Sequence, residues 1–287
     1  MLLRPCQCEV SDIARMVHPG KRGHKIVAVL QFRFDESYDA QVMSVGGWIA
    51  TEEEWKKLES TWQRRIDFEN ARNCPDQQIT RFHASHMNCK DGEYENWDKG
   101  MCLRFSRKLI DMLGKRKMGA IAVACDMDAI QTVFRKGDPE TMKRRTYVLC
   151  MKAMMVSVGT VMQEIFPNDT VLLIHDHGNW DDAVLQAYNL MVDEPDWPRR
   201  EVFEGLVMKT GGNCIGLQAA DMIAYEVFKG VKAKTFSGDA EMRGAMKNLA
   251  SQAPIRAQWI DLPAAQALYR VMKDSGKYPN LDEQGVA

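Results

Sequence analysis

The segment 216–226 constrains the fold more than any other part of the sequence. It reads Gly-Leu-Gln-Ala-Ala-Asp-Met-Ile-Ala-Tyr-Glu, which predicts an apolar helix of small residues with one carboxylate, Asp221, near its middle. Burying a carboxylate among such residues costs several kcal/mol unless a cation or hydrogen bonds compensate for the lost water. The rest of the chain must therefore supply a partner for Asp221 or an aqueous cleft beside it.

Two other aspartates directly follow strongly apolar runs. Asp35 follows residues 26–34 and Asp176 follows residues 171–175, and both runs have the composition of buried strands. Because α/β sheets usually place their chemistry at strand ends, we expect Asp35, Asp176 and Asp221 to converge on Mg²⁺ or Mn²⁺. The alternatives are turn acids for the first two and a buried, hydrogen-bonded acid for Asp221.

The order of the predicted elements is typical of an α/β fold with a mixed sheet flanked by helices. A hairpin of strands 26–34 and 42–50, joined by a turn at 35–39, precedes alternating helices and strands. We predict an N-terminal extension over residues 1–24 and one domain over 25–287, with a C-terminal helical elaboration from about residue 238. The further predicted strands are 119–125, 170–175 and 202–208, and an extended piece covers 81–86; the predicted helices are 52–71, 98–114, 139–166, 180–192, a helix around Asp221, 239–251 and 263–274.

Side chains that cap helices mark three of these helix starts. Thr51 and Glu54 form a capping-box pattern, Asp138 precedes a proline in a first turn, and Asn179 precedes the helix 180–192. These residues predict where the chain turns from strand or loop into helix.

The composition predicts a soluble cytoplasmic protein without a membrane partner. The 38 basic and 39 acidic side chains nearly cancel, so that any nucleic-acid surface must be local. Runs such as Lys143-Arg144-Arg145 are more often solvated helix faces. Eight cysteines with no C-x-x-C and no signal peptide indicate reduced thiols. The longest apolar stretch, 147–166, contains Lys152 and Glu164 and predicts a buried helix.

Four segments, taken in order, resemble a known family. They are Phe34-Asp35-Glu36-Ser37, Phe82-His83-Ala84, the acid Asp176 after its strand, and Leu217-Gln218-Ala219-Ala220-Asp221. Together they resemble the domain-of-unknown-function family numbered three-thousand-eight-hundred, whose members are similar to ribonuclease H in fold. The resemblance covers about residues 26–229. It implies a ribonuclease-H-like sheet and, by analogy, a two-metal nuclease centre.

The resemblance also implies roles for single residues. Asp35 would be the metal ligand of the first strand, Asp176 the ligand after a later strand, and Asp221 the ligand of the last core helix. Glu36 and His83 match motif positions and are further candidate catalytic residues. A role as general acid or base suits His83, since the ordinary pKa of histidine is near neutrality.

The histidines beside Asp176 raise an alternative metal site. His175 and His177 flank Asp176, and imidazole ligands favour Zn, Mn or Fe over Mg. In a strand, however, residues two apart share a face, so both histidines would point away from Asp176 if the strand persists there.

Two further polar residues have both a functional and a structural interpretation. Gln218 lies three residues before Asp221 on the same helix face, where it would orient Asp221, contact substrate or serve as a core amide. Asp126 follows the predicted strand 119–125 and is a candidate fourth carboxylate, although a turn or N-cap acid is the favoured interpretation.

The leading hypothesis is a nuclease that depends on Mg²⁺ or Mn²⁺ and hydrolyses RNA or DNA phosphodiester bonds, with nucleic acid as its partner and a homo-oligomer as a possible assembly. One alternative is a non-catalytic module that binds nucleic acid or protein on the same scaffold. Another is a phosphoesterase for small nucleotides. The motifs of phosphate-loop enzymes, dinucleotide-binding folds and common hydrolases are absent from the sequence.

Overall fold

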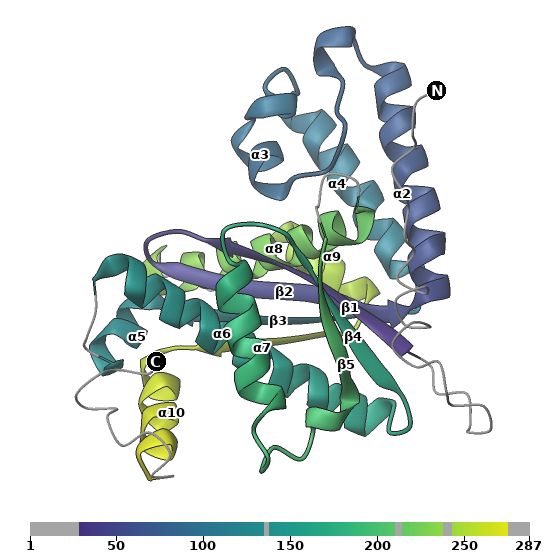
Figure 1. Ribbon diagram of the computed structural model, residues 1–287. Helices are drawn as coiled ribbons and strands as arrows, with labels where there is room; N and C mark the ends of the chain where they lie inside the picture. The colour runs from purple at the N-terminus through teal and green to yellow at the C-terminus, as the bar shows by residue number, and fades with distance from the viewer. Residues whose placement is uncertain (1–28, 135–137, 210–213, 238–242, 275–287) are drawn as a thin grey trace, which may run out of the picture.

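A six-stranded mixed sheet lies between two layers of helices in the computed structural model, which describes residues 29–134, 138–209, 214–237 and 243–274 (Figure 1). β2 pairs antiparallel with β1 and with β3, and the other neighbours are parallel. The mixed α/β architecture predicted from the sequence is therefore confirmed. In sheet order the strands are β5 (Phe203–Lys209), β4 (Thr170–Asp176), β1 (Val29–Tyr38), β2 (Val42–Thr51), β3 (Gly119–Asp126) and β6 (Ile255–Ile260).

Each face of the sheet carries its own set of helices and its own core. Successive β3 residues show the division, since Ala122 belongs to one core and Val123 to the other. On the first face lie α2 (Glu52–Arg72), α4 (Lys99–Gly114), α8 (Ile215–Ser237) and α9 (Gly244–Gln252). On the second face lie α5 (Met127–Phe134), α6 (Pro139–Ile165), α7 (Asp181–Val192) and α10 (Leu262–Asp274).

β1 illustrates how alternation assigns side chains to these faces. Phe32 and Phe34 are fully buried in the core beneath α6. Arg33 points to the opposite face, where its guanidinium lies 4.3 Å over the ring of Trp55 and forms an ion pair with Glu59 of α2. By the same alternation Asp35 shares the face of Arg33 and α8.

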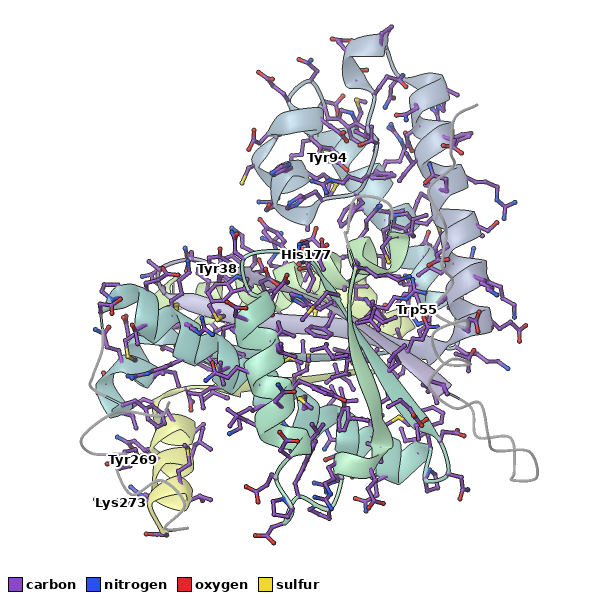
Figure 2. The ribbon with its side chains drawn as sticks, in the orientation of Figure 1. Tyr38, Trp55, Tyr94, His177, Tyr269 and Lys273 are labelled. Atoms are coloured by element: carbon purple, nitrogen blue, oxygen red, sulfur yellow. The ribbon has the colours of Figure 1, made fainter. Side chains whose placement is uncertain are left out.

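α2, α4 and the short helix α3 (Ala84–Cys89) rise above the sheet as a helical unit (Figure 1). In Figure 2 Tyr94 marks this unit, and Trp55 marks the foot of α2 next to the sheet. The indole N–H of Trp55 donates to the Gln31 carbonyl at 3.1 Å, which joins α2 to β1. The unit has an aromatic interior built from Trp62, Phe82, Tyr94, Trp97 and Phe105.

The turn predicted at 35–39 is wrong, because β1 continues to Tyr38. Its pairing with β2 extends to the pair Tyr38 and Met43, so Asp35 lies within the strand and not after it. Asp39 closes the short connection by accepting from the amides of Gln41 and Val42 at 2.8 and 3.0 Å. The hairpin itself is confirmed.

Several other boundaries also differ from the predictions. The extended piece predicted at 81–86 contains the start of α3, and neither α5 nor β6 was predicted. α7 is preceded by Trp180 as its N-cap residue, without a side-chain cap, so Asn179 does not have the predicted role. Thr51 and Asp138 are confirmed as N-cap residues, since Thr51 accepts from the amide of Glu54 and Asp138 accepts from two amides of the first turn of α6. The capping box is present only in its Thr51 half, because the Glu54 carboxylate accepts from the Lys117 amide and pairs with Lys57.

α6 has the length and hydropathy of a membrane span, but 61% of its most apolar window is buried within the protein. It is the core helix that the interrupted apolar stretch 147–166 predicted. The predicted extension over residues 1–24, and the predicted start of a helix at Asp239, lie outside the described residues.

Candidate functional site

The fold brings two of the three predicted aspartates side by side on neighbouring strands, Asp35 within β1 and Asp176 at the end of β4. β1 and β4 are adjacent and parallel, and Phe34 pairs with His175, so Asp35 and Asp176 come one residue beyond that pair. Both side chains face α8, since Phe34 and His175 belong to the opposite face.

α8 carries the third aspartate across the same face. The hydroxyl of Ser44 donates to the Ala224 carbonyl at 2.8 Å, and the indole N–H of Trp48 donates to the Ala219 carbonyl at 2.9 Å. These two contacts from β2 hold α8 on both sides of Asp221. Small residues in this helix allow the close approach that places Asp221 near the strand ends.

Electrostatic interactions show that the acids lie close to one another. Burial raises the pKa of Asp35 well above its ordinary value, and the negative charges of Glu36, Asp221 and Asp176 raise it further. Burial likewise raises the pKa of Asp221 to about 7, with contributions from Glu36 and Asp176, although the Ala84 N–H and the charge of Arg81 oppose the shift. We refer to Asp35, Glu36, Asp176 and Asp221 as the carboxylate cluster.

Among the residues that the structure describes, no three His, Cys, Asp or Glu side chains stand in an arrangement that encloses a metal ion. The carboxylate cluster is therefore a concentration of negative charge, and the predicted metal site stays a prediction. Its donors nevertheless fit a hard divalent cation, because oxygen ligands suit Mg²⁺ and Mn²⁺ and because a cation would relieve the repulsion that raises the pKa values of Asp35 and Asp221.

Asp221 also holds the segment before α3. One of its carboxylate oxygens accepts from the Ala84 amide at 2.7 Å and lies 3.5 Å from Nδ1 of His83. The Tyr94 hydroxyl donates to the Arg81 carbonyl at 2.8 Å, which fixes the other side of the segment. Asp221 and His83, both singled out in the sequence, are thus neighbours in space.

His83 is neutral at physiological pH. Burial lowers its pKa to about 4, and the positive charges of His86 and Arg81 contribute in the same direction. Its ring stacks on that of His86 with centroids 4.0 Å apart, and Nδ1 lies 3.2 Å from the Ser85 hydroxyl. In this state His83 can accept a proton or a hydrogen bond at the rim of the carboxylate cluster.

Glu36 is bound on the side of β1 that faces α6. Its carboxylate lies 3.1 Å from Nε2 of His175, and the same nitrogen lies 3.0 Å from the hydroxyl of Tyr147 on α6. The Glu36 amide donates to the Asp35 carboxylate at 2.8 Å, so the two acids are joined through the backbone.

The alternative site of histidines around Asp176 does not form in the described structure. β4 persists through Asp176, and His175 is buried on the opposite face against Phe34. His177, labelled in Figure 2, is exposed, and its Nδ1 contacts the carboxylate of Asp181. Strand alternation therefore separates His175 from Asp176, and His177 follows the end of β4 and turns to Asp181 instead.

Gln218 and Asp126 have structural contacts that match their structural interpretations. The side-chain oxygen of Gln218 accepts from the Trp62 indole at 3.1 Å and from the Phe82 amide at 2.9 Å, which makes it a buried link between α8 and the helical unit. Asp126 accepts from the Ala129 amide at 3.0 Å at the start of α5.

Three participants were missed by sequence reasoning: the Ala84 amide, the Arg81 charge and the Tyr147 hydroxyl. A backbone amide has no sequence signal, and Tyr147 lies far from His175 in the chain. Of the three, only Arg81 could have been found from the sequence, because it stands two residues before His83.

No protein-family model matches the chain, and no curated protein matches it. The carboxylate cluster between β1, β4 and α8 is therefore the candidate functional site on the chemistry of its own residues.

Proposed function

We propose that the protein is a ribonuclease-H-like nuclease that depends on Mg²⁺ or Mn²⁺, as its resemblance to the family named above implies. The carrying observation is that acids from β1, β4 and α8 lie close enough together for the charge of Asp176 to raise the pKa of Asp35 and the pKa of Asp221, both of which burial raises first. Such repulsion is costly to maintain, and it favours a site that attracts divalent cations.

The sheet supports the proposal through the placement of the acids. A strand hairpin leads into parallel strands, and the first two acids lie near the carboxyl ends of the neighbours β1 and β4. This is the end of an α/β sheet at which ligands usually bind. The third acid lies on α8, which packs against β1 and β2.

Each residue of the cluster has a distinct part in the proposal. Asp35, Asp176 and Asp221 would hold the cation, which when bound supplies activation of water and stabilisation of charge on the phosphate. Neutral His83 stands beside Asp221 as a proton acceptor at the rim, and its pKa of about 4 leaves it without the proton that a general acid needs near pH 7. Glu36 is oriented by His175 and adds negative charge to the cluster.

Nuclease activity tests the proposal directly. Single- and double-stranded RNA and DNA would be incubated with the protein and Mg²⁺ or Mn²⁺, and the wild type compared with Asp221→Asn and with Asp126→Asn as a matched control. We expect the first variant to lose at least about a hundredfold in rate and the control to keep its rate. Equal cleavage by wild type and Asp221→Asn would contradict the mechanism.

A second candidate function is a non-catalytic module that binds nucleic acid or protein. The observation that favours it is that, among the described residues, no three His, Cys, Asp or Glu side chains are arranged to hold a metal ion. Such a module would give no saturable heat when Mn²⁺ is added in a calorimeter. Both candidate functions include the proposals that the protein binds nucleic acid, lies in the cytoplasm and self-associates.

A further inference from the structure

A pocket of about 330 Å³ lies between α3, α4, α8 and the start of α9, on the face of the sheet that carries α8 (Figure 1). Its lining includes Ala84, whose amide donates to the Asp221 carboxylate at 2.7 Å. The lining also includes Met222, the residue after Asp221, and Tyr225, which lies about one helical turn of 5.4 Å further along α8. The pocket therefore adjoins the carboxylate cluster.

The interior of the pocket combines apolar walls with polar groups at its border. Phe82 and Met222 are wall residues that are buried to within 2% and 3% of full burial. Asn88 and Ser106 add a side-chain amide and a hydroxyl. The Asn88 oxygen accepts from Arg243 at 3.3 Å, which leaves the Asn88 NH₂ group as a donor. This lining suits a flat group that is apolar on its faces and polar at its edge, such as a nucleobase.

Two lysines of the lining supply positive charge. Lys90 directly follows α3, Lys99 begins α4, and both are exposed. Neither forms an ion pair with an acid in the part of the chain that the structure describes. Burial raises the pKa of the Cys102 thiol in the lining, and the charge of Lys90 opposes that rise, so this charge reaches the pocket. Arg243 is instead engaged, since it pairs with Glu226 at 3.1 Å.

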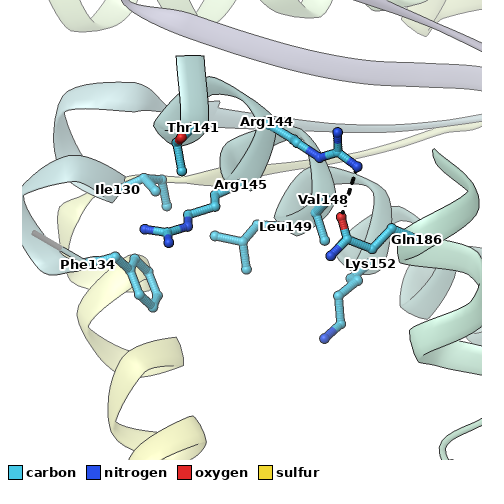
Figure 3. A pocket seen from close by; sticks show the side chains of 9 residues that line it. All are labelled: Ile130, Phe134, Thr141, Arg144, Arg145, Val148, Leu149, Lys152 and Gln186. Atoms are coloured by element: carbon cyan, nitrogen blue, oxygen red, sulfur yellow. Dashed lines mark hydrogen bonds between the residues drawn. The ribbon is translucent and has the colours of Figure 1, made fainter. Parts of the chain in front are cut away.

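The hollow shown in Figure 3 is a poorer candidate for the same ligand. It lies between α5, α6 and α7, on the face of the sheet opposite α8. One of its cations, Arg144, donates to the side-chain oxygen of Gln186 at 3.5 Å. A strand bound at the carboxylate cluster could not place a base there, because the sheet lies between the two sites.

We propose that the pocket between α3, α4 and α8 holds one base of a single-stranded nucleic acid whose neighbouring phosphate lies at the carboxylate cluster. The proposal rests on the proposed nuclease function and adds a preference for single strands to it. The volume equals roughly eleven water molecules, which accommodates the about eight to eleven non-hydrogen atoms of a base. Lys90 and Lys99 suit the flanking phosphates. A base in a duplex would first have to leave its stack and its partner.

Fluorescence anisotropy with labelled strands in a chelating buffer, where no cation supports cleavage, tests the class of ligand. The probes are single strands of uridine RNA and thymidine DNA of about ten residues, each beside a strand of the same backbone without bases and a duplex of equal length. We expect RNA or DNA to bind at least about tenfold more tightly than its base-free match and its duplex. The tighter of the two identifies the sugar. The proposal is overturned if neither strand binds, or if a base-free strand or a duplex binds as tightly.

Lysine variants test the location through the dependence on salt. Lys90→Gln and Lys99→Gln should each weaken binding about three- to tenfold and lower the slope of log Kd against log salt by about 0.7, the share of one phosphate contact on a single strand. Lys273→Gln is the matched control, because Lys273 is exposed on α10 on the other face of the sheet (Figure 2). Unchanged affinity and slope in both folded lysine variants would place the strand elsewhere.

A variant that fills the pocket tests the base itself. Ser106→Phe should lower the affinity for the single strand to that of the base-free strand and leave base-free binding unchanged. Ser60→Phe, on the exposed face of α2, is its control and should bind as the wild type does. A thermal melt checks folding, and the lysine variants decide if Ser106→Phe does not fold. These measurements need no cleavage, so their failure is distinct from equal cleavage by wild type and Asp221→Asn.

Discussion

Asp221 keeps its proton to a higher pH in the folded chain than in the unfolded one, because burial and neighbouring acids raise its pKa from 3.8 to about 7. Protonated Asp221 therefore favours the folded state. This contribution is fully present below pH 3.8 and is lost as the pH rises through about 7. The consequence is that ionised Asp221 destabilises the cation-free protein at neutral and alkaline pH.

Asp221→Asn should accordingly stabilise the cation-free protein, and more so at pH 8 than at pH 5. We expect the gain in the free energy of unfolding to be larger at pH 8 by about 1–3 kcal/mol, because the asparagine side chain keeps an acceptor for the Ala84 amide and never ionises. Urea denaturation in a chelating buffer at both pH values measures the difference. Asp76→Asn, in the exposed 3-10 helix Pro75–Gln77, is the control and should show no such difference. A gain for Asp221→Asn that is equal at both pH values would show that charge is not the cause.

Gln218 should contribute to stability and not to ion binding. Gln218→Leu leaves the Trp62 indole and the Phe82 amide buried without an acceptor, which predicts a loss of about 2–5 kcal/mol in the free energy of unfolding. Gln63→Leu on the exposed face of α2 is the control and should change stability by less than about 0.5 kcal/mol. Chemical denaturation of the two variants decides, and a loss below about 1 kcal/mol for Gln218→Leu would contradict its role as a link.

The sequence singles out individual residues where a charge interrupts an apolar pattern. Asp35, Asp176 and Asp221 were identified in this way, and the charges of Asp176 and Asp221 reach Asp35 across β1, β4 and α8, whereas their role as metal ligands stays a prediction. The partners of Asp221 were not predictable, because a backbone amide looks the same at every position. His83 was found through a motif, and its stacking on His86 emerges only from the fold.

At the scale of elements, α8 depends on a close approach to β2. A Cβ atom at Gly46 would lie 3.1 Å from the Ala122 Cβ and 3.2 Å from the backbone of Ala224. Both distances are tighter than ordinary packing, so an added methyl group must push α8 away from the sheet.

Gly46→Ala should therefore destabilise the protein by about 1–3 kcal/mol, in line with the effect of overpacking. Gly230→Ala in α8 is the matched control, because nothing lies within 4 Å of an added Cβ there. Its expected effect lies between none and a gain of about 1 kcal/mol. Thermal unfolding compares the two variants, and equal melting temperatures would show that α8 has room to shift.

Elements with a periodic pattern and a cap were predictable, and short ones were not. The capping side chains of Thr51 and Asp138 predicted the starts of α2 and α6. β1 was predicted too short, since its last residues are polar and gain their strand conformation from pairing with β2. β6 is held by pairing with β3, and α5 is held by contacts with α6. These contacts come from distant parts of the chain, so the local sequence pattern does not predict them.

At the scale of the whole molecule, the sheet separates two layers of helices, each with its own core. Asp35, Asp176 and Asp221 of the carboxylate cluster face α8, whereas Glu36 faces α6 through His175 and Tyr147. The layered α/β architecture followed from the order of elements, whereas the position of each charge depended on strand register and helix packing.

Binding of Mn²⁺ to the wild type and to Asp35→Asn, followed by isothermal titration calorimetry, tests most directly whether the carboxylate cluster is a cation site. We predict saturable binding to the wild type, at least about tenfold weaker binding to Asp35→Asn, and wild-type binding to Asp126→Asn, whose carboxylate caps α5. Absence of saturable heat in the folded wild type, or equal affinity in Asp35→Asn, would contradict it.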